Sequence, residues 1–365
     1  MISMNAFEAE PEELRLRELA ALERVVRSGR YVLGREVLAF EEAWAAACGV
    51  AHAVGVGNGM DAIELGLRAR NLGVGDEIIT TPMTAFATTL AILRAGATPV
   101  FADIDAETAL LDPASVERCI TPRTRAVLLV HLYGRMHDLE RWTTLCAEHR
   151  LLLLEDCAQA HAARWAGRPA GSWGSWGAFS FYPTKNLGAL GDGGMLVTDD
   201  EPTARRARIL RNYGQTERYH HPELGLNSRL DELQAALLGE RLAWLPRFNE
   251  RRRDHASRLR AGLRNPLVRP LSAPPQSASH VHHLFVVRCA RRDDFAAFLA
   301  ARGIETLIHY PIPIHHQAPC VGFARDPRGL AAAEAHAAEC LSLPCHPQLS
   351  DDELRCVTDA VNDFR

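Results

Sequence analysis

Lysine is almost absent from this chain of 365 residues. Lysine and arginine together number 41, and Lys185 is the only lysine among them. An arginine replaces a lysine wherever a positive charge is enough, but its guanidinium is never a free amine and cannot form a Schiff base. Lys185 is therefore either a lone surface residue or the carrier of covalent amine chemistry. The count does not separate the two interpretations, so the surrounding residues must.

Other features are also missing, and each absence excludes a class of protein. No apolar run is long enough to span a bilayer, and residues 1–15 lack the apolar segment of a signal peptide. A formal charge of −4 gives no reason to expect nucleic acid as a partner. Nine cysteines without a Cys-x-x-Cys pair favour free thiols in a reducing, cytoplasmic compartment. The histidine pairs at 220–221, 282–283 and 315–316 have no carboxylate or cysteine at a metal-binding spacing, so no metal site is predicted.

Short β-branched or aliphatic runs alternate with amphipathic stretches over the first 200 residues. Strands are predicted at 52–56, 77–81, 98–103, 125–131, 150–155, 177–182 and 193–198. Helices are predicted at 11–28, 35–47, 60–71, 84–95, 113–119 and 138–149. This alternation predicts an α/β fold with a mostly parallel seven-stranded sheet covered by helices.

The composition changes in the last third of the chain. A long helical stretch at 230–262 precedes a connector rich in proline and serine at 267–279. Beyond it we expect strands at 282–288 and 304–309 and helices at 292–302, 330–340 and 351–363. Two domains are therefore predicted: a large α/β domain with N-terminal helices over residues 1–245, and a small α+β domain over residues 246–365.

Asp156 follows a continuous apolar strand at its carboxyl end, where α/β sheets build their sites. A carboxylate there could keep a pyridine nitrogen protonated, which makes pyridoxal phosphate an electron sink. Taken alone, Asp156 is better explained as the N-cap of the next segment. Lys185, the Schiff-base candidate, lies beyond the next strand and favours the first interpretation. Gln159 could hydrogen-bond the phenolic oxygen of the same cofactor.

A glycine-rich turn at 55–62 lies between a predicted strand and a predicted helix. Amides at such a turn, here those of Gly59 and Met60, can bind a phosphate, and Ser180 could add a hydroxyl donor. The motif is weak because neither the dinucleotide pattern nor a P-loop lysine is present. At the next strand–helix junction, Phe86 could stack on a cofactor ring or simply belong to the core.

Three segments resemble the DegT/DnrJ/EryC1/StrS family of sugar aminotransferases, which have PLP fold type I. They are Glu155–His161, Ser180–Leu187 and Gly191–Gly194. Further matches occur at Ser28–Gly34, Gly96–Asp105, Val130–Gly134, Arg211–Gly214 and Gly225–Ala236. The resemblance extends over about 25–350, and it implies pyridoxal 5′-phosphate as the cofactor.

The resemblance also implies a role for each candidate. Lys185 would form the Schiff base with the cofactor and move the proton between cofactor and substrate carbons, while Asp156 would pair with the pyridine nitrogen. The implied cofactor contacts are the phenolic oxygen for Gln159, the ring face for Phe86, and the phosphate for Gly59, Met60 and Ser180. Asn227 would reach the phosphate of the neighbouring subunit's cofactor, which implies a homodimer with shared active sites.

The turn departs from many relatives, which have Ser-Gly-Thr where this chain has Asn58-Gly59-Met60. Met60 offers only its amide to a phosphate. This form of the turn, and the segment 306–315, resemble the branch that aminates nucleotide-linked 3-oxo-6-deoxyhexoses. The implied reaction takes an amino group from glutamate to C3 of a dTDP-linked keto-sugar. Substrate contacts are then expected from Tyr182, His309, Tyr310 and, for the pyrophosphate, Arg229 or Arg211.

Other functions remain open on the sequence. Amination at C4, or of a keto-inositol, would use the same scaffold. A PLP-dependent sugar dehydratase is disfavoured because those relatives replace the lysine with histidine. A PLP-binding regulatory protein without turnover belongs to a different class, and the intact set of Asp156, Gln159, Ser180 and Lys185 argues against it.

Overall fold

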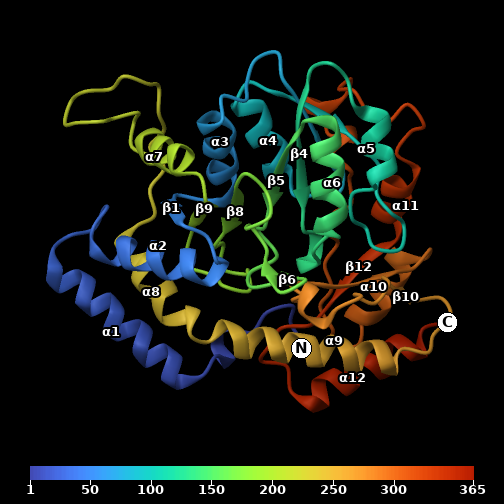
Figure 1. The fold of residues 1–365 in the computed structure, drawn as a ribbon. Helices are drawn as coiled ribbons and strands as arrows, with labels where there is room; N and C mark the ends of the chain where they lie inside the picture. Colours follow the sequence, from blue (N-terminus) through green and yellow to red (C-terminus); the bar gives the residue numbers. More distant parts are fainter.

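A twisted seven-stranded sheet forms the centre of the molecule, as Figure 1 shows for the computed structural model, which describes residues 1–365. The strand order is β1-β9-β8-β5-β4-β2-β3, and only β9 runs antiparallel to its neighbours. The predicted mostly parallel sheet is therefore confirmed. The strands are β1 (His52–Val56), β2 (Glu77–Thr80), β3 (Thr98–Phe101), β4 (Thr124–Val130), β5 (Leu152–Asp156), β8 (Gly177–Ser180) and β9 (Gly194–Thr198). A small hairpin of β6 (Arg164–Trp165) and β7 (Arg168–Pro169) lies between β5 and β8.

Helices cover both faces of this sheet. One face packs against α2 (Arg35–Cys48), α5 (Pro113–Cys119), α6 (Leu139–His149) and α8 (Glu232–Leu242). The other packs against α3 (Gly59–Ala69), α4 (Phe86–Arg94) and α7 (Glu201–Leu210). Strand β5 contributes Leu153 to the first layer and Leu154 to the second, since successive side chains point to opposite faces. The uninterrupted apolar run of this strand follows from burial on both sides.

Two helical features differ from the sequence-based prediction. The stretch 230–262 is two helices, α8 and α9 (Leu245–Gly262), and Pro246 lies in the first turn of α9, where its missing N–H costs no hydrogen bond. Helix α7 was not predicted. Its buried residues are Thr203, Ala204, Ala207 and Leu210, so the segment is amphipathic but contains few large apolar residues that would mark it as a helix. The Asp200 side chain caps it by accepting from Thr203 N at 2.9 Å. The N-terminal helix α1 (Glu12–Ser28) packs on α8.

The C-terminal part builds its own core around a three-stranded antiparallel sheet. Its strands are β10 (Arg269–Pro270), β11 (Phe285–Arg288) and β12 (Cys340–Leu343), and its helices are α10 (Arg292–Ala300), α11 (Ala331–Glu339) and α12 (Asp351–Asp363). The second half of α9 packs into this core through Ala256 and Leu259. The domain boundary at 245/246 stays a prediction.

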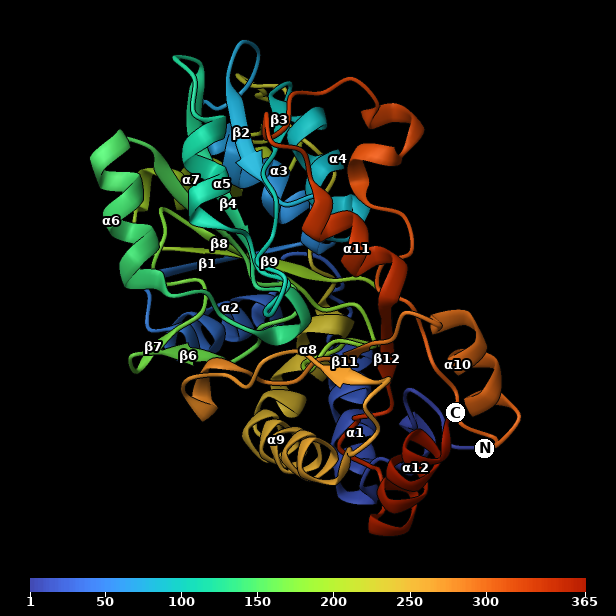
Figure 2. The ribbon, with the colours of Figure 1, turned by 90° about the vertical axis from the view of Figure 1, so that its right-hand side faces the viewer.

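Two strand assignments in this part need correction. The segment 304–309 is not a strand, because Ile304 bridges only to Ile2 and Leu307 only to Ser342, so pairing changes partner before a ladder can form. Strand β12 was not predicted and directly follows α11. The N-terminal residues pack on this part of the chain, where Figure 2 shows the N-terminus beside α12. Ile2 N donates to Gly303 O at 2.7 Å and Met4 N donates to Glu305 Oε2 at 2.8 Å.

No helix of the structure combines the length and apolarity needed to cross a membrane. All nine cysteines are unpaired, and eight are buried, with only Cys356 exposed.

Candidate active site

Asp156 and Lys185 come from neighbouring strands of the sheet and lie at its carboxyl edge. Asp156 ends β5 and is in register with Ala178 of β8, and the chain reaches Lys185 shortly after β8 ends. Asp156 is buried, whereas the Lys185 side chain remains partly exposed. The two are close enough for the carboxylate to affect the lysine's pKa. The structure therefore brings together the two residues that the sequence singled out.

The Lys185 amine is held without a hydrogen-bond partner in the chain. Its backbone N–H donates to Tyr182 O at 2.8 Å, but its side chain takes part in none of the chain's hydrogen bonds or ion pairs. Burial lowers the pKa of Lys185 to about 8, and the Asp156 carboxylate opposes this shift. A lysine with a lowered pKa is a free amine in an appreciable fraction of molecules near neutral pH. That is the form a nucleophile or a general base requires.

Two donors orient the Asp156 carboxylate. Thr88 Oγ1 donates to Oδ2 at 2.8 Å, and Ala158 N donates to Oδ1 at 3.1 Å. Thr88 also shares a 2.8 Å hydrogen bond with Thr84. Burial raises the pKa of Asp156, while Thr88, Ala158 N and Lys185 lower it, and the net direction is upward. Sequence reasoning missed Thr88. Its only signal was a second threonine four residues earlier, at the start of α4.

A compact cradle forms where the end of β8 meets the start of α3. A Cβ at Gly59 would lie 2.6 Å from Ser180 Cβ, so only glycine permits this approach. The Asn58 side chain accepts from Asp61 N at 2.9 Å, which caps the helix and leaves the amides of Gly59 and Met60 without intrahelical acceptors. Two free amides at a helix N-terminus beside a serine hydroxyl fit a phosphate group.

Gln159 connects the site to the C-terminal part of the chain. Its Oε1 accepts from Tyr133 N at 2.5 Å, and its Nε2 donates to Tyr310 Oη at 3.3 Å. Burial and the Asp156 charge raise the pKa of Tyr310 to about 12. Burial and Lys185 lower that of His309 to about 4, and His309 Nδ1 bonds Ser342 Oγ at 2.8 Å. His309 therefore lies within electrostatic reach of Lys185, and Tyr310 within reach of Asp156, while their roles as substrate contacts stay predictions.

Phe86 opens α4, two residues before Thr88. Its side chain is half-buried and packs against the hydrophobic cluster that contains Met83 and Tyr133 and that Tyr310 also touches. Because Thr88 of the same helix donates to Asp156, Phe86 lies on an element that reaches the Asp156 region. Stacking of Phe86 on a cofactor stays a prediction.

Three expected site residues make no hydrogen bond or ion pair with Lys185 or Asp156 within one chain. Tyr182 is 53% exposed and Asn227 is exposed. Arg229 donates to Asn212 Oδ1 at 3.0 Å and lies over the ring of Tyr213. Their predicted roles stay predictions.

Arg211 has a structural role instead. It is buried, pairs with Glu41 and donates to Gly55 O at 2.8 Å. A guanidinium occupied in this way cannot also reach a substrate, so its interpretation as a pyrophosphate ligand is not supported.

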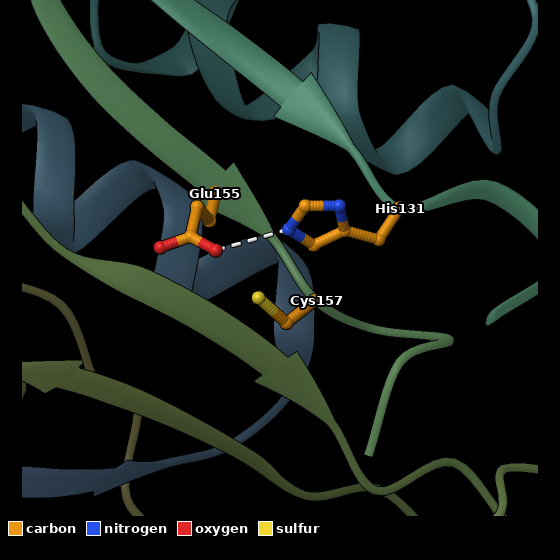
Figure 3. Close-up of side chains that lie close together, drawn as sticks. All are labelled: His131, Glu155 and Cys157. Atoms are coloured by element: carbon orange, nitrogen blue, oxygen red, sulfur yellow. Dashed lines mark hydrogen bonds and ion pairs between the residues drawn. The ribbon is translucent and has the colours of Figure 1, made fainter. Parts of the chain in front are cut away.

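A second polar cluster lies on the other face of β5, formed by His131, Glu155 and Cys157 (Figure 3). Glu155 accepts from His131 Nε2 at 3.0 Å and from three backbone N–H groups, those of Gly171, Trp173 and Gly174. Burial raises the pKa of the Cys157 thiol well above its usual value, and the Glu155 charge adds to this. Since the carboxylate is saturated by protein donors and the sulfur stays a thiol, this cluster is a hydrogen-bonded support.

Comparisons with known proteins bear on this site. The model of the DegT/DnrJ/EryC1/StrS aminotransferase family matches residues 12–362. The chain is 47% identical to the dTDP-3-amino-3,4,6-trideoxy-alpha-D-glucose transaminase of Streptomyces venezuelae, over 97% of this chain and 93% of the relative. It is 42% identical to the pleiotropic regulatory protein of Geobacillus stearothermophilus, over 97% of this chain and 95% of the relative.

The fold agrees with the sequence match. The crystal structure of S. venezuelae DesV in complex with a ketimine intermediate superposes with a TM-score of 0.95 at 46% identity, over 99% of this chain and 98% of that chain. The fold type predicted from the sequence is thereby confirmed.

Proposed function

The chain belongs to the DegT/DnrJ/EryC1/StrS aminotransferase family, and from this premise we propose that it transfers an amino group to a nucleotide-linked keto-sugar. It is an aminotransferase that depends on pyridoxal phosphate. One observation carries the assignment of the site. The only lysine of the chain is an unbonded amine of lowered pKa beside the buried carboxylate of Asp156.

The residues of the cradle and the strand ends fit this cofactor. When bound, it supplies the electron sink that stabilises negative charge on the substrate carbon. Asp156 would hold its ring nitrogen, and Lys185 would bind its aldehyde carbon and carry the proton to and from the substrate. The amides of Gly59 and Met60 with Ser180 would bind its phosphate.

Two further residues complete the cofactor site in this proposal. Gln159 would donate to the phenolic oxygen, because its amide has two N–H donors and the chain uses one of them. Phe86 would cover one ring face.

The proposed acceptor is a dTDP-linked 3-oxo-6-deoxyhexose, aminated at C3 with glutamate as the donor. The name of the S. venezuelae relative supports this choice, as do the Asn-Gly-Met turn and the segment 306–315. Tyr182, His309 and Tyr310 would contact the sugar nucleotide, and Arg229 its pyrophosphate. A 4-oxo-sugar or a keto-inositol is the alternative acceptor on the same scaffold. The regulatory alternative is not favoured, because the site retains its complete catalytic set.

The active unit in this proposal is a cytoplasmic homodimer with shared sites. The loop after α7 stands clear of the body of the molecule in Figure 1 and carries Tyr219 and Leu224, which are 78% and 89% exposed. Asn227 at its base would reach the partner's cofactor phosphate. The unpaired, mostly buried cysteines fit a reducing compartment.

Mixing two inactive variants tests the shared site. Lys185→Arg and Asn227→Ala subunits are unfolded together and refolded as random dimers. In a mixed dimer, one site combines an intact Lys185 with an intact Asn227. We expect the mixture to recover up to about a quarter of parental activity, well above the mean of the separate variants. Activity equal to that mean would contradict shared sites.

Spectroscopy tests the acceptor. The enzyme is converted by glutamate to its aminated cofactor form, and dTDP-linked 3-oxo- and 4-oxo-6-deoxyhexoses are then added separately. Return of the visible absorption with the 3-oxo sugar alone is the expected result. Return with only the 4-oxo sugar would keep the chemistry and reject the proposed carbon. No return with either would reject the substrate class.

A further inference from the structure

Two adjacent histidines and a glutamate from another helix converge on one point of the C-terminal part. His315 and His316 belong to the short 3-10 helix Ile314–His316, and Glu334 lies in α11. His315 Nε2 is 3.1 Å from Glu334 Oε1, and His316 Nε2 is 3.6 Å from the same oxygen. All three ligand atoms lie within 4.8 Å of one another. Neither histidine has another hydrogen-bond partner through Nε2.

We propose that His315, His316 and Glu334 bind a divalent cation of the zinc type, with water in the remaining position. Zinc takes imidazole nitrogen and carboxylate oxygen at about 2.0–2.2 Å, so a tetrahedral site places neighbouring ligand atoms about 3.4 Å apart. The two observed separations lie on either side of that value. The cation therefore fits between side chains that already face one another, and small rotations of the two half-exposed ones complete the geometry.

The donor atoms of the three residues suit a borderline-soft cation. Neutral imidazole is the form that ligates. One carboxylate and two imidazoles are the donors that zinc, cobalt and nickel prefer, whereas magnesium and calcium require more oxygen atoms. Arg325 is a charged neighbour of His315, and its repulsion limits the affinity.

The site would join two segments that meet at the catalytic centre. The segment 309–316 carries His309 and Tyr310, and Ile314 N donates to Pro82 O at 2.9 Å, just before Phe86. Helix α11 carries His336, whose Nε2 bonds Tyr133 Oη at 2.9 Å. A cation between His316 and Glu334 would tie these segments together from outside the active site. This inference does not depend on the proposed substrate.

Cobalt(II) is the probe, because it occupies tetrahedral zinc sites and absorbs visible light when bound there. Tag-free holoenzyme is titrated with Co²⁺, and the difference spectrum is recorded against metal-free holoenzyme. His316→Ala and Glu334→Gln change half-exposed side chains, so the fold should persist. His221→Ala is the matched control, since His220 and His221 are also adjacent and exposed but do not form a cluster with a carboxylate or thiol that could hold a metal ion.

The expected result is a tetrahedral band that saturates at one Co²⁺ per chain and is displaced by Zn²⁺. Its affinity should fall at least about tenfold in His316→Ala and Glu334→Gln and stay unchanged in His221→Ala. Zn²⁺ should also raise the melting temperature of the parent and the control but not of the two site variants. The absence of a tetrahedral band, or equal affinity in all four proteins, would overturn the proposal.

Discussion

Two carboxylates follow one another at the end of β5, and the protein treats them in opposite ways. Glu155 points to one face of the sheet and is fully buried, with its oxygens filled by His131 and three backbone N–H groups. Asp156 points to the other face, receives one hydroxyl and one backbone N–H, and lies beside an amine that bonds nothing.

The pKa values of the two carboxyl groups shift in opposite directions. Burial alone would raise the pKa of Glu155, but His131 and the backbone donors bring it below its ordinary value. The pKa of Asp156 stays above its ordinary value despite Thr88 and Ala158 N. A carboxylate whose oxygens all accept from fixed donors stabilises the fold. A carboxylate with fewer donors can still accept a hydrogen bond from a ligand.

The largest expected effect comes from Lys185→Arg, which keeps a positive charge near Asp156 but removes the amine. Because a guanidinium is never a free nucleophile, amination activity should fall at least about 10⁴-fold. Borohydride treatment of the loaded parent followed by peptide mass spectrometry should attach the cofactor at residue 185, and the variant should show no adduct there. An adduct elsewhere in the parent, or turnover by the variant, would reject the assignment.

Exchanging carboxylate for amide on each face tests the comparison directly. Glu155→Gln should lower the free energy of unfolding by about 3–5 kcal/mol, because the negative charge is lost and one acceptor oxygen is replaced by an NH₂ group that faces other donors. Activity per folded molecule should stay close to that of the parent. Asp156→Asn should do the reverse, with stability nearly unchanged and kcat reduced about 10²–10³-fold.

Denaturant unfolding and single-turnover rates measure the two quantities separately. If both variants lost stability and rate together, the division of labour between the two faces would be wrong.

Thr88→Val removes one of the two hydrogen bonds to Asp156 without changing the shape of the side chain. We expect kcat to fall about tenfold, the equivalent of about 1.4 kcal/mol, because the carboxylate is less well oriented. Thr89→Val is the matched control, since the buried Thr89 hydroxyl has no partner to lose. Equal effects from the two variants would show that Thr88 acts only through packing.

The last prediction concerns stability rather than rate, and it is a pH dependence of unfolding in the cofactor-free protein. The folded pKa of Lys185, about 8, lies below its ordinary value of 10.5, so the unfolded chain binds more protons between these pH values. Stability should therefore rise with pH across that window, and Lys185→Met should remove this contribution. In urea titrations at pH 7 and pH 10, the advantage of the variant over the parent should shrink at the higher pH. A constant difference would mean that Lys185 titrates normally.

Several features of the fold were readable from the sequence because they depend on local patterns. The seven strands of the main sheet and most of the helices that cover it follow from alternating runs of apolar residues, and β5 was predicted as an unbroken apolar run. The segment 304–309 and β12 were assigned incorrectly, since their state depends on which partner strand reaches them. Helix α7 was missed because its buried face is made of small residues and a single leucine among many arginines.

The sequence by itself predicted which residue carries the proposed chemistry. Lys185 is the only lysine in a chain that otherwise uses arginine, and the segments around Asp156 and Lys185 match the motifs of a known family. Only the tertiary structure decided what the neighbouring groups do. It turned Arg211 inward to Glu41, placed Thr88 on Asp156, and brought Glu334 to a histidine pair 18 residues away. These outcomes depend on distances between segments remote in the chain, which close only when the core packs.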